Sequence, residues 1–193
     1  MNIANYILNF LAPNASAFEE STKNPIRAQE KVLFRILKRN RAAEYGIKNN
    51  FSKVKSIKDY RSYVPIVDYE TIRPLIERLM RGENNILTSD KVIFFGTTSG
   101  TTSKPKLIPL TKYSKSEKNS LMDLWVYYLL KSHPRITDGK ILAIISPEIE
   151  GFSEEGKIPY GAESGYAYKH QNSFIRWLYA LPYEVFNIKD YEA

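Results

Sequence analysis

One short loop constrains this chain more than any other part of its sequence. Residues 97–106 read Thr-Thr-Ser-Gly-Thr-Thr-Ser-Lys-Pro-Lys and lie between two apolar runs, Val92–Phe95 and Leu107–Leu110. Small residues let backbone N–H groups converge on an anion, hydroxyls add donors, and lysine adds positive charge. Because α/β folds place ligand sites directly after strands, the pattern predicts a phosphate-binding loop that connects a strand to a helix and is mobile without ligand.

The residues alone leave a second interpretation open, a polar surface turn rich in Ser and Thr. The loop is not a Walker A loop, because neither Gly96 nor Gly100 begins the required spacing to Gly-Lys-Ser/Thr. Pro105 favours the phosphate site, since proline holds the chain extended and fixes where Lys106 leaves the loop.

Hydrophobic periodicity and capping residues predict an α/β fold with helices packed on a mostly parallel sheet. Pro74 is expected to break or kink its helix. We expect no internal boundary, so residues 1–193 are interpreted as a single partial domain. Expected helices cover residues 1–13, 24–45, 56–63, 68–81, a stretch beginning at 114, and 174–181; expected strands cover 91–95 and 140–145, and 148–165 is expected to be a long loop.

Composition excludes several classes of function. The absence of cysteine excludes disulfides, thiolate nucleophiles and Cys-ligated metals, and it favours the cytoplasm. No apolar run approaches the ~20 residues of a membrane span. The net charge of +7 permits nucleic-acid binding, but the basic residues are dispersed and their densest cluster, 35–41, lies along one expected helix. We therefore expect neither a nucleic acid nor a membrane as partner.

Neither of the two histidines has a spaced partner for a triad or a metal site. His133 and His170 are therefore interpreted as ordinary surface residues. Glu148, Glu150 and the acidic pair Glu154–Glu155 could form an acidic patch, but solvated loop charges are the default interpretation.

Thr98–Lys106 resembles the signature loop of the adenylate-forming superfamily, Thr-Ser-Gly-Thr-Thr-Gly-x-Pro-Lys-Gly. Ser103 and Leu107 stand where that pattern has glycine. The continuation Leu107–Pro109 is similar to one branch, the acyl-acid–amido synthetases, which comprise the plant auxin-conjugating (Gretchen Hagen) family and its bacterial relatives. Further segments resemble this branch at residues 64–82, 146–161 and 180–186.

The resemblance implies the N-terminal part of the large domain of an adenylate-forming enzyme. It implies an ATP-dependent ligase that joins a small carboxylic acid to an amine or amino acid through an acyl adenylate. Lys106 would act catalytically by offsetting charge on the phosphates. The residues implied to bind ATP are Thr98, Ser99, Gly100, Thr101, Thr102, Ser103 and Lys106.

The resemblance also implies Mg²⁺. Tyr160–Glu163 resembles the superfamily's magnesium-binding element poorly, so the ligand of the metal is expected outside this chain. The adenine contacts, the acyl pocket and a C-terminal lid are likewise expected beyond Ala193.

Three other functions stay open. A catalytically incomplete fragment could act as a binding or interaction module. An acyl-CoA ligase would carry the same loop, although Leu107–Pro109 argues against it. A basic nucleic-acid-binding domain would fit the charge, but the sequence lacks a recognisable motif for one.

Overall fold

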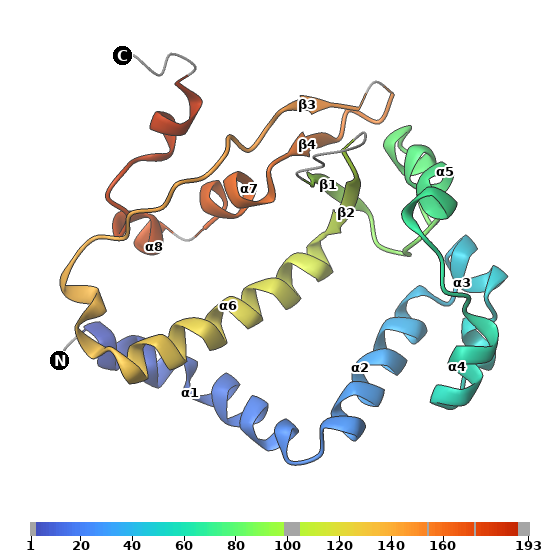
Figure 1. The fold of residues 1–193 in the computed structure, drawn as a ribbon, viewed down its shortest axis with the longest axis horizontal. Helices are drawn as coiled ribbons and strands as arrows, with labels where there is room; N and C mark the ends of the chain where they lie inside the picture. Colours follow the sequence, from blue (N-terminus) through green and yellow to red (C-terminus); the bar gives the residue numbers. More distant parts are fainter. Residues whose placement is uncertain (1–2, 99–104, 154, 172, 189–193) are drawn as a thin grey trace.

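The computed structural model describes residues 3–98, 105–153, 155–171 and 173–188. Eight α-helices, three short 3₁₀ helices and four strands alternate along these residues (Figure 1). The α-helices are α1 (Ile3–Thr22), α2 (Pro25–Asn40), α3 (Glu44–Lys48), α4 (Ile57–Tyr63), α5 (Tyr69–Met80), α6 (Lys112–Ser132), α7 (Glu163–Lys169) and α8 (Ser173–Trp177). The 3₁₀ helices are η1 (Phe51–Lys53), η2 (Pro134–Asp138) and η3 (Tyr183–Asn187), and the strands are β1 (Val92–Thr97), β2 (Leu107–Thr111), β3 (Gly151–Phe152) and β4 (Pro159–Gly161).

The strands form one sheet in the order β2-β1-β4-β3, and the expected α/β class is confirmed. The sheet is mixed. Its central pair, β1 and β4, is parallel, as the crossover through α6 requires, whereas β1–β2 and β3–β4 are antiparallel. The antiparallel pairs join strands that follow one another closely in the chain.

The core surrounds β1. Phe94 and Phe95 are both 0% exposed, and neighbouring side chains of a strand point to opposite faces. Phe95 packs in a cluster with Ile76 and Leu79 of α5, whereas Phe94 packs with Tyr166 of α7. β1 is therefore buried on both faces and gives the following loop a firm base.

The predicted helix starts are confirmed where a side chain caps them. The side chains of Asn24, Ser56 and Asp68 each accept a hydrogen bond from a backbone N–H three residues later. The helix predicted to begin at 114 begins earlier, at Lys112, because Thr111 and Ser114 cap each other.

Two predicted helix ends are wrong. α1 continues beyond Pro13 to Thr22, and α2 ends at Asn40, so that Gly46 lies within the separate helix α3. A Cβ on Gly46 would lie 2.1 Å from the carbonyl oxygen of Asn40. This glycine thus serves a close backbone approach between α2 and α3.

α5 runs without interruption through Pro74, so the predicted break is not found. Pro74 is exposed, whereas Ile76 and Leu79 on the opposite face are 2% exposed. Their burial outweighs the one helical hydrogen bond that proline removes.

The predicted strand at 140–145 is also wrong. Among the described residues, its backbone pairing is one isolated parallel bridge between Ile141 and Tyr179. Leu142 is 69% and Ile144 is 93% exposed, so this apolar run lacks the neighbours that would make it a strand.

The predicted long loop at 148–165 contains β3, β4 and the start of α7. The two strands pair antiparallel, and beyond the paired residues the Ser153 N–H donates to the Ile158 carbonyl at 3.0 Å. The prediction failed because polar residues dominate the segment although its backbone extends the sheet.

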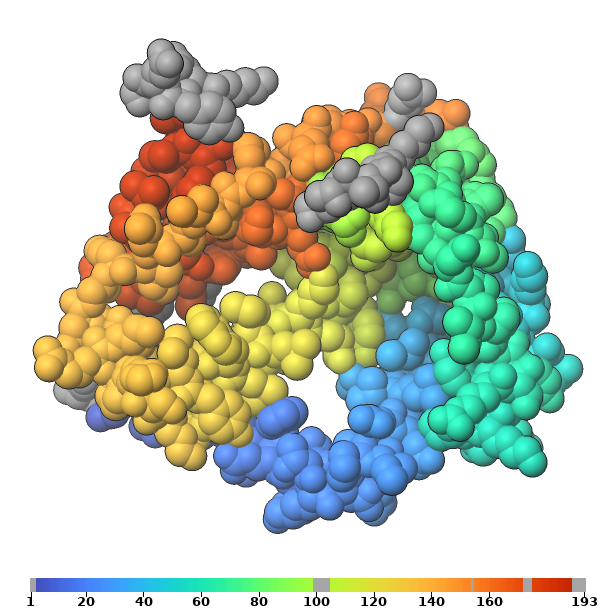
Figure 2. All heavy atoms as spheres, viewed as in Figure 1, coloured from blue at the N-terminus to red at the C-terminus, as the bar shows by residue number. Residues whose placement is uncertain are grey.

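α1 packs against α6: Asn14 donates to the Ser120 carbonyl at 3.2 Å, and the Tyr128 hydroxyl donates to Glu19 at 3.0 Å. The assembly of helices is open, and Figure 2 shows openings beside α6. The chain exposes 13575 Å², whereas a compact monomer of 22.3 kDa exposes about 9400 Å². The chain therefore buries less of its surface than a compact monomer of the same mass.

Candidate phosphate-binding site

The base of the predicted phosphate loop is an antiparallel hairpin. Thr97 at the end of β1 pairs with Leu107 at the start of β2. Beyond this pair, the Thr98 N–H donates to the Lys106 carbonyl at 3.1 Å, and the Lys106 N–H donates to the Thr98 hydroxyl at 3.3 Å. The hairpin therefore brings together two of the predicted site residues, Thr98 and Lys106.

The prediction that the loop connects a strand to a helix is wrong, because a second strand follows it. Leu107–Thr111 pairs with β1 along its length, and α6 begins only after it. Leu110 of this segment is buried against Phe94 of β1, and this contact stabilises a strand at this position. The remaining predicted site residues, Ser99, Gly100, Thr101, Thr102 and Ser103, and the expected mobility of the loop lie outside the described residues.

The Lys106 side chain is exposed, and its ammonium lies 5.6 Å from the centre of the Tyr69 ring. No carboxylate within the described part of the chain forms an ion pair with it. Thr71 lowers the pKa of Asp68 through hydrogen bonds, and the more distant Lys106 charge adds to this effect. The ammonium is thus held near acidic residues but is available to an anion.

The Tyr69 hydroxyl contacts the backbone where the loop ends. It accepts a hydrogen bond from the Leu107 N–H at 2.8 Å and donates one to the Leu107 carbonyl at 3.3 Å. Tyr69 is the first residue of α5, behind the N-cap Asp68. The sequence interpretation did not identify Tyr69, although it lies within the segment that resembles the amido synthetases.

A second contact holds the beginning of the loop. The Thr97 hydroxyl donates to a carboxylate oxygen of Glu150 at 3.0 Å, and the Glu150 N–H donates to the Tyr160 carbonyl at 2.9 Å. Glu150 is exposed, but it is a partner of the loop base and not simply a solvated charge.

The contacts of Glu148 overturn two predictions: that Glu148 is a solvated loop charge and that His170 is an ordinary surface residue. The Glu148 side chain is only 5% exposed, and its oxygens lie 2.6 Å from the Lys169 ammonium and 2.7 Å from His170 Nε2. Gly165 permits this burial, since a Cβ there would lie 2.6 Å from the Glu148 nitrogen. Burial raises the pKa of Tyr166, which stacks on His170, and the negative charge of Glu148 raises it further. This cluster connects α7 to the 146–148 segment.

The described residues offer no metal centre, because no three of their carboxylate or histidine side chains converge. Glu163 forms an ion pair with Lys118 of α6. The expectation that Mg²⁺ is bound from outside this chain stays a prediction.

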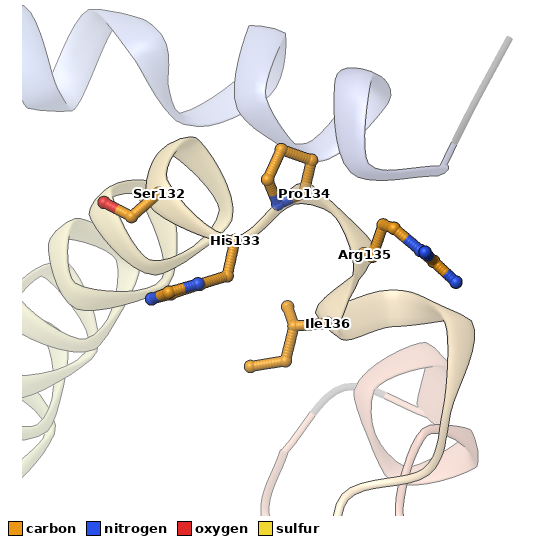
Figure 3. A pocket seen from close by; sticks show the side chains of 5 residues that line it. All are labelled: Ser132, His133, Pro134, Arg135 and Ile136. Carbon is orange, nitrogen blue, oxygen red and sulfur yellow. The ribbon is translucent and has the colours of Figure 1, made fainter.

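A shallow hollow of about 500 Å³ lies at the far end of α6 (Figure 3). It is lined by one continuous segment, Ser132–Ile136, and His133 and Arg135 point in different directions. α6 has 21 residues, which places this hollow ~30 Å along the helix from the hairpin. His133 is exposed, and the hollow has no link to the loop.

A family model described as the GH3 family N-terminal domain matches residues 14–193. The chain belongs to the GH3 family. It is 34% identical over 140 residues to the indole-3-acetic acid-amido synthetase GH3.2 of Arabidopsis thaliana, which covers 72% of this chain and 26% of that protein. The corresponding synthetase GH3.15 of the same plant is 35% identical over 129 residues and covers 66% and 22%.

Solved GH3 structures share the fold. The GH3.15 acyl acid amido synthetase superposes with a TM-score of 0.76 and 26% identity over 91% of this chain and 31% of its own. The structure of AtGH3.15 in complex with 2,4-DB superposes with a TM-score of 0.68. The chain spans about a quarter of the length of the curated GH3 relatives that it matches. No helix in its described part is long and apolar enough to cross a bilayer.

Proposed function

We propose that this chain is the phosphate-binding part of an ATP-dependent acyl-acid–amido synthetase. In this reaction a small carboxylic acid displaces pyrophosphate from ATP, and the acyl group then passes to an amine or amino acid while AMP leaves. The observation that carries the proposal is the hairpin that sets Thr98 beside Lys106 at the ends of a loop rich in hydroxyls. The names of the GH3 relatives support the same reaction.

The described residues fit an anionic ligand. The exposed Lys106 ammonium supplies charge, the Thr98 hydroxyl supplies a polar group, and β1 supplies a rigid base. Lys106 would stabilise negative charge on the phosphates as pyrophosphate leaves. Ser99–Ser103 would add hydroxyl and N–H donors. Mg²⁺ would be held by residues outside this chain, and we place the protein in the cytoplasm, as its lack of cysteine favours.

The test compares the wild type with Lys106→Ala and with a matched control, Lys91→Ala, which removes an exposed lysine at the opposite end of β1. ATP affinity is measured by displacement of a fluorescent ATP analogue. We expect Lys106→Ala to weaken binding about tenfold or more, because a charge-assisted hydrogen bond is lost, and Lys91→Ala to change nothing. Equal binding by all three proteins would refute the phosphate site.

A catalytically incomplete fragment that acts as a binding module is the second candidate. The short span of the chain relative to its GH3 relatives and its open surface favour it. We propose that residues 1–193 are one partial domain that binds ATP weakly without forming acyl adenylate. ATP–pyrophosphate exchange across a panel of carboxylic acids tests this proposal: exchange above the level of Lys106→Ala would show a self-sufficient ligase and refute the incomplete fragment.

A further inference from the structure

We infer that Tyr69 is a positioning residue that sets Lys106 for the phosphates of ATP; the inference rests on the proposed function. Tyr69 lies 38 residues from Leu107 in the sequence, yet its hydroxyl makes two hydrogen bonds to the Leu107 backbone, at 2.8 and 3.3 Å. A phenolic hydroxyl can both donate and accept a hydrogen bond, and the Tyr69 hydroxyl makes one bond of each kind with the same residue. That residue directly follows Lys106.

Tyr69 is itself fixed in place. Its ring packs against the cluster that contains Ile76 and Phe95, and its backbone begins α5 directly after the N-cap residue Asp68. A hydroxyl held in this way transmits the position of α5 to the end of the loop. The direction in which the Lys106 side chain leaves the backbone is therefore set by the core and not by the loop alone.

The face of the Tyr69 ring also lies close to the Lys106 ammonium. The Lys106 ammonium lies 5.6 Å from the ring centre, and the Arg73 guanidinium lies 4.8 Å from it. Arg73 forms two hydrogen bonds with Glu70, at 2.6 and 2.7 Å, which hold it in place. A cation–π contact at an exposed site is weaker than a charge-assisted hydrogen bond to phosphate. The Lys106 ammonium can therefore contact the ring without ligand and move to a phosphate when ATP binds.

Tyr69→Phe tests this role, because it removes both hydrogen bonds but keeps the ring in the core. Tyr128→Phe is the matched control: its hydroxyl makes one hydrogen bond to Glu19, away from the loop. We expect Tyr69→Phe to weaken ATP binding about fivefold and Tyr128→Phe to leave it unchanged. Combined with Lys106→Ala, Tyr69→Phe should have no further effect, since residues that act through one another are not additive.

Each outcome decides the inference. If Lys106→Ala weakens binding and Tyr69→Phe does not, the inference fails and the proposed function stands. If Tyr69→Phe lowers affinity by the same factor with and without Lys106, Tyr69 is only a scaffold, and the inference again fails. If Lys106→Ala has no effect, the proposed function fails and the inference with it. Should Tyr69→Phe not fold, amide exchange in the wild type is decisive: ATP should slow exchange of the Leu107 N–H, and unchanged exchange would reject the role.

Discussion

The Thr97 hydroxyl donates a hydrogen bond of 3.0 Å to Glu150, a residue 53 positions later in the chain. This contact joins the end of β1 to the segment that leads into β3. Tyr69 holds the other end of the loop through Leu107. The loop thus leaves and re-enters the sheet at two points, each tied by a side chain from a distant segment.

Thr97→Val should lower the free energy of unfolding by about 1 kcal/mol. The substitution keeps the shape and the β-branched side chain, and it removes only the hydroxyl that Glu150 accepts from. Urea denaturation measures the change. Glu150→Gln is the control, because its amide oxygen can still accept the bond; an equal loss in both variants would contradict the assignment of the bond.

Gly165→Ala should destabilise the protein although alanine favours helices. A Cβ at Gly165 would lie 2.3 Å from the Ser146 carbonyl oxygen and 2.7 Å from a Pro147 backbone carbon. Because backbone atoms cannot move aside easily, we expect a loss of about 2–3 kcal/mol. Gly139→Ala is the matched control, since a Cβ there meets nothing within 4 Å. Thermal denaturation of both variants checks this, and equal stabilities would disprove the close packing.

Asp68 should make stability depend on acid pH. The Thr71 hydroxyl and N–H donate to its carboxylate at 2.6 and 2.8 Å and lower its pKa. The folded state therefore holds a proton on Asp68 less readily than the unfolded state, in which the pKa is about 3.9. The charge stabilises the fold above that pH, and this contribution disappears as the pH falls through the folded pKa.

The measurement is the difference in melting temperature between the wild type and Asp68→Asn from pH 2.5 to 7. Asparagine caps helices as well as aspartate does, so the variant removes the charge and little else. The wild type should melt higher at pH 6 and lose that advantage below about pH 4. A difference that does not vary with pH would contradict the prediction. Thr71→Val should shrink the difference at pH 6.

Pro74→Ala should stabilise the protein by about 1–3 kcal/mol. Alanine restores the N–H that α5 lacks opposite the Glu70 carbonyl, and the exposed Pro74 side chain contributes little packing. Chemical denaturation compares it with Pro182→Ala, which lies outside the α-helices and should give no such gain. A loss of stability in Pro74→Ala would mean that proline serves the helix in another way.

Local features of the sequence predicted the parts of this protein that depend on near neighbours. Asn24, Ser56 and Asp68 cap their helices through contacts three residues away, so a short window contains all the information needed. The loop from Thr98 to Lys106 indicated the superfamily for the same reason, and Leu107–Pro109 with further short segments indicated the GH3 family, which is confirmed.

Contacts between distant segments were decided only by the tertiary structure. Leu107–Thr111 became a strand because β1 lies beside it, whereas the equally apolar 140–145 run has only the Ile141–Tyr179 bridge among the described residues. The Tyr69 hydroxyl and the buried Glu148 carboxylate have partners 38 and 22 residues away. A strand needs a neighbour, and a buried polar group needs a partner. The sequence alone predicted the helix starts that a side chain caps and the loop that we propose as a phosphate site. The folded chain decided which residues hold the ends of that loop, because such contacts form only when remote segments pack together.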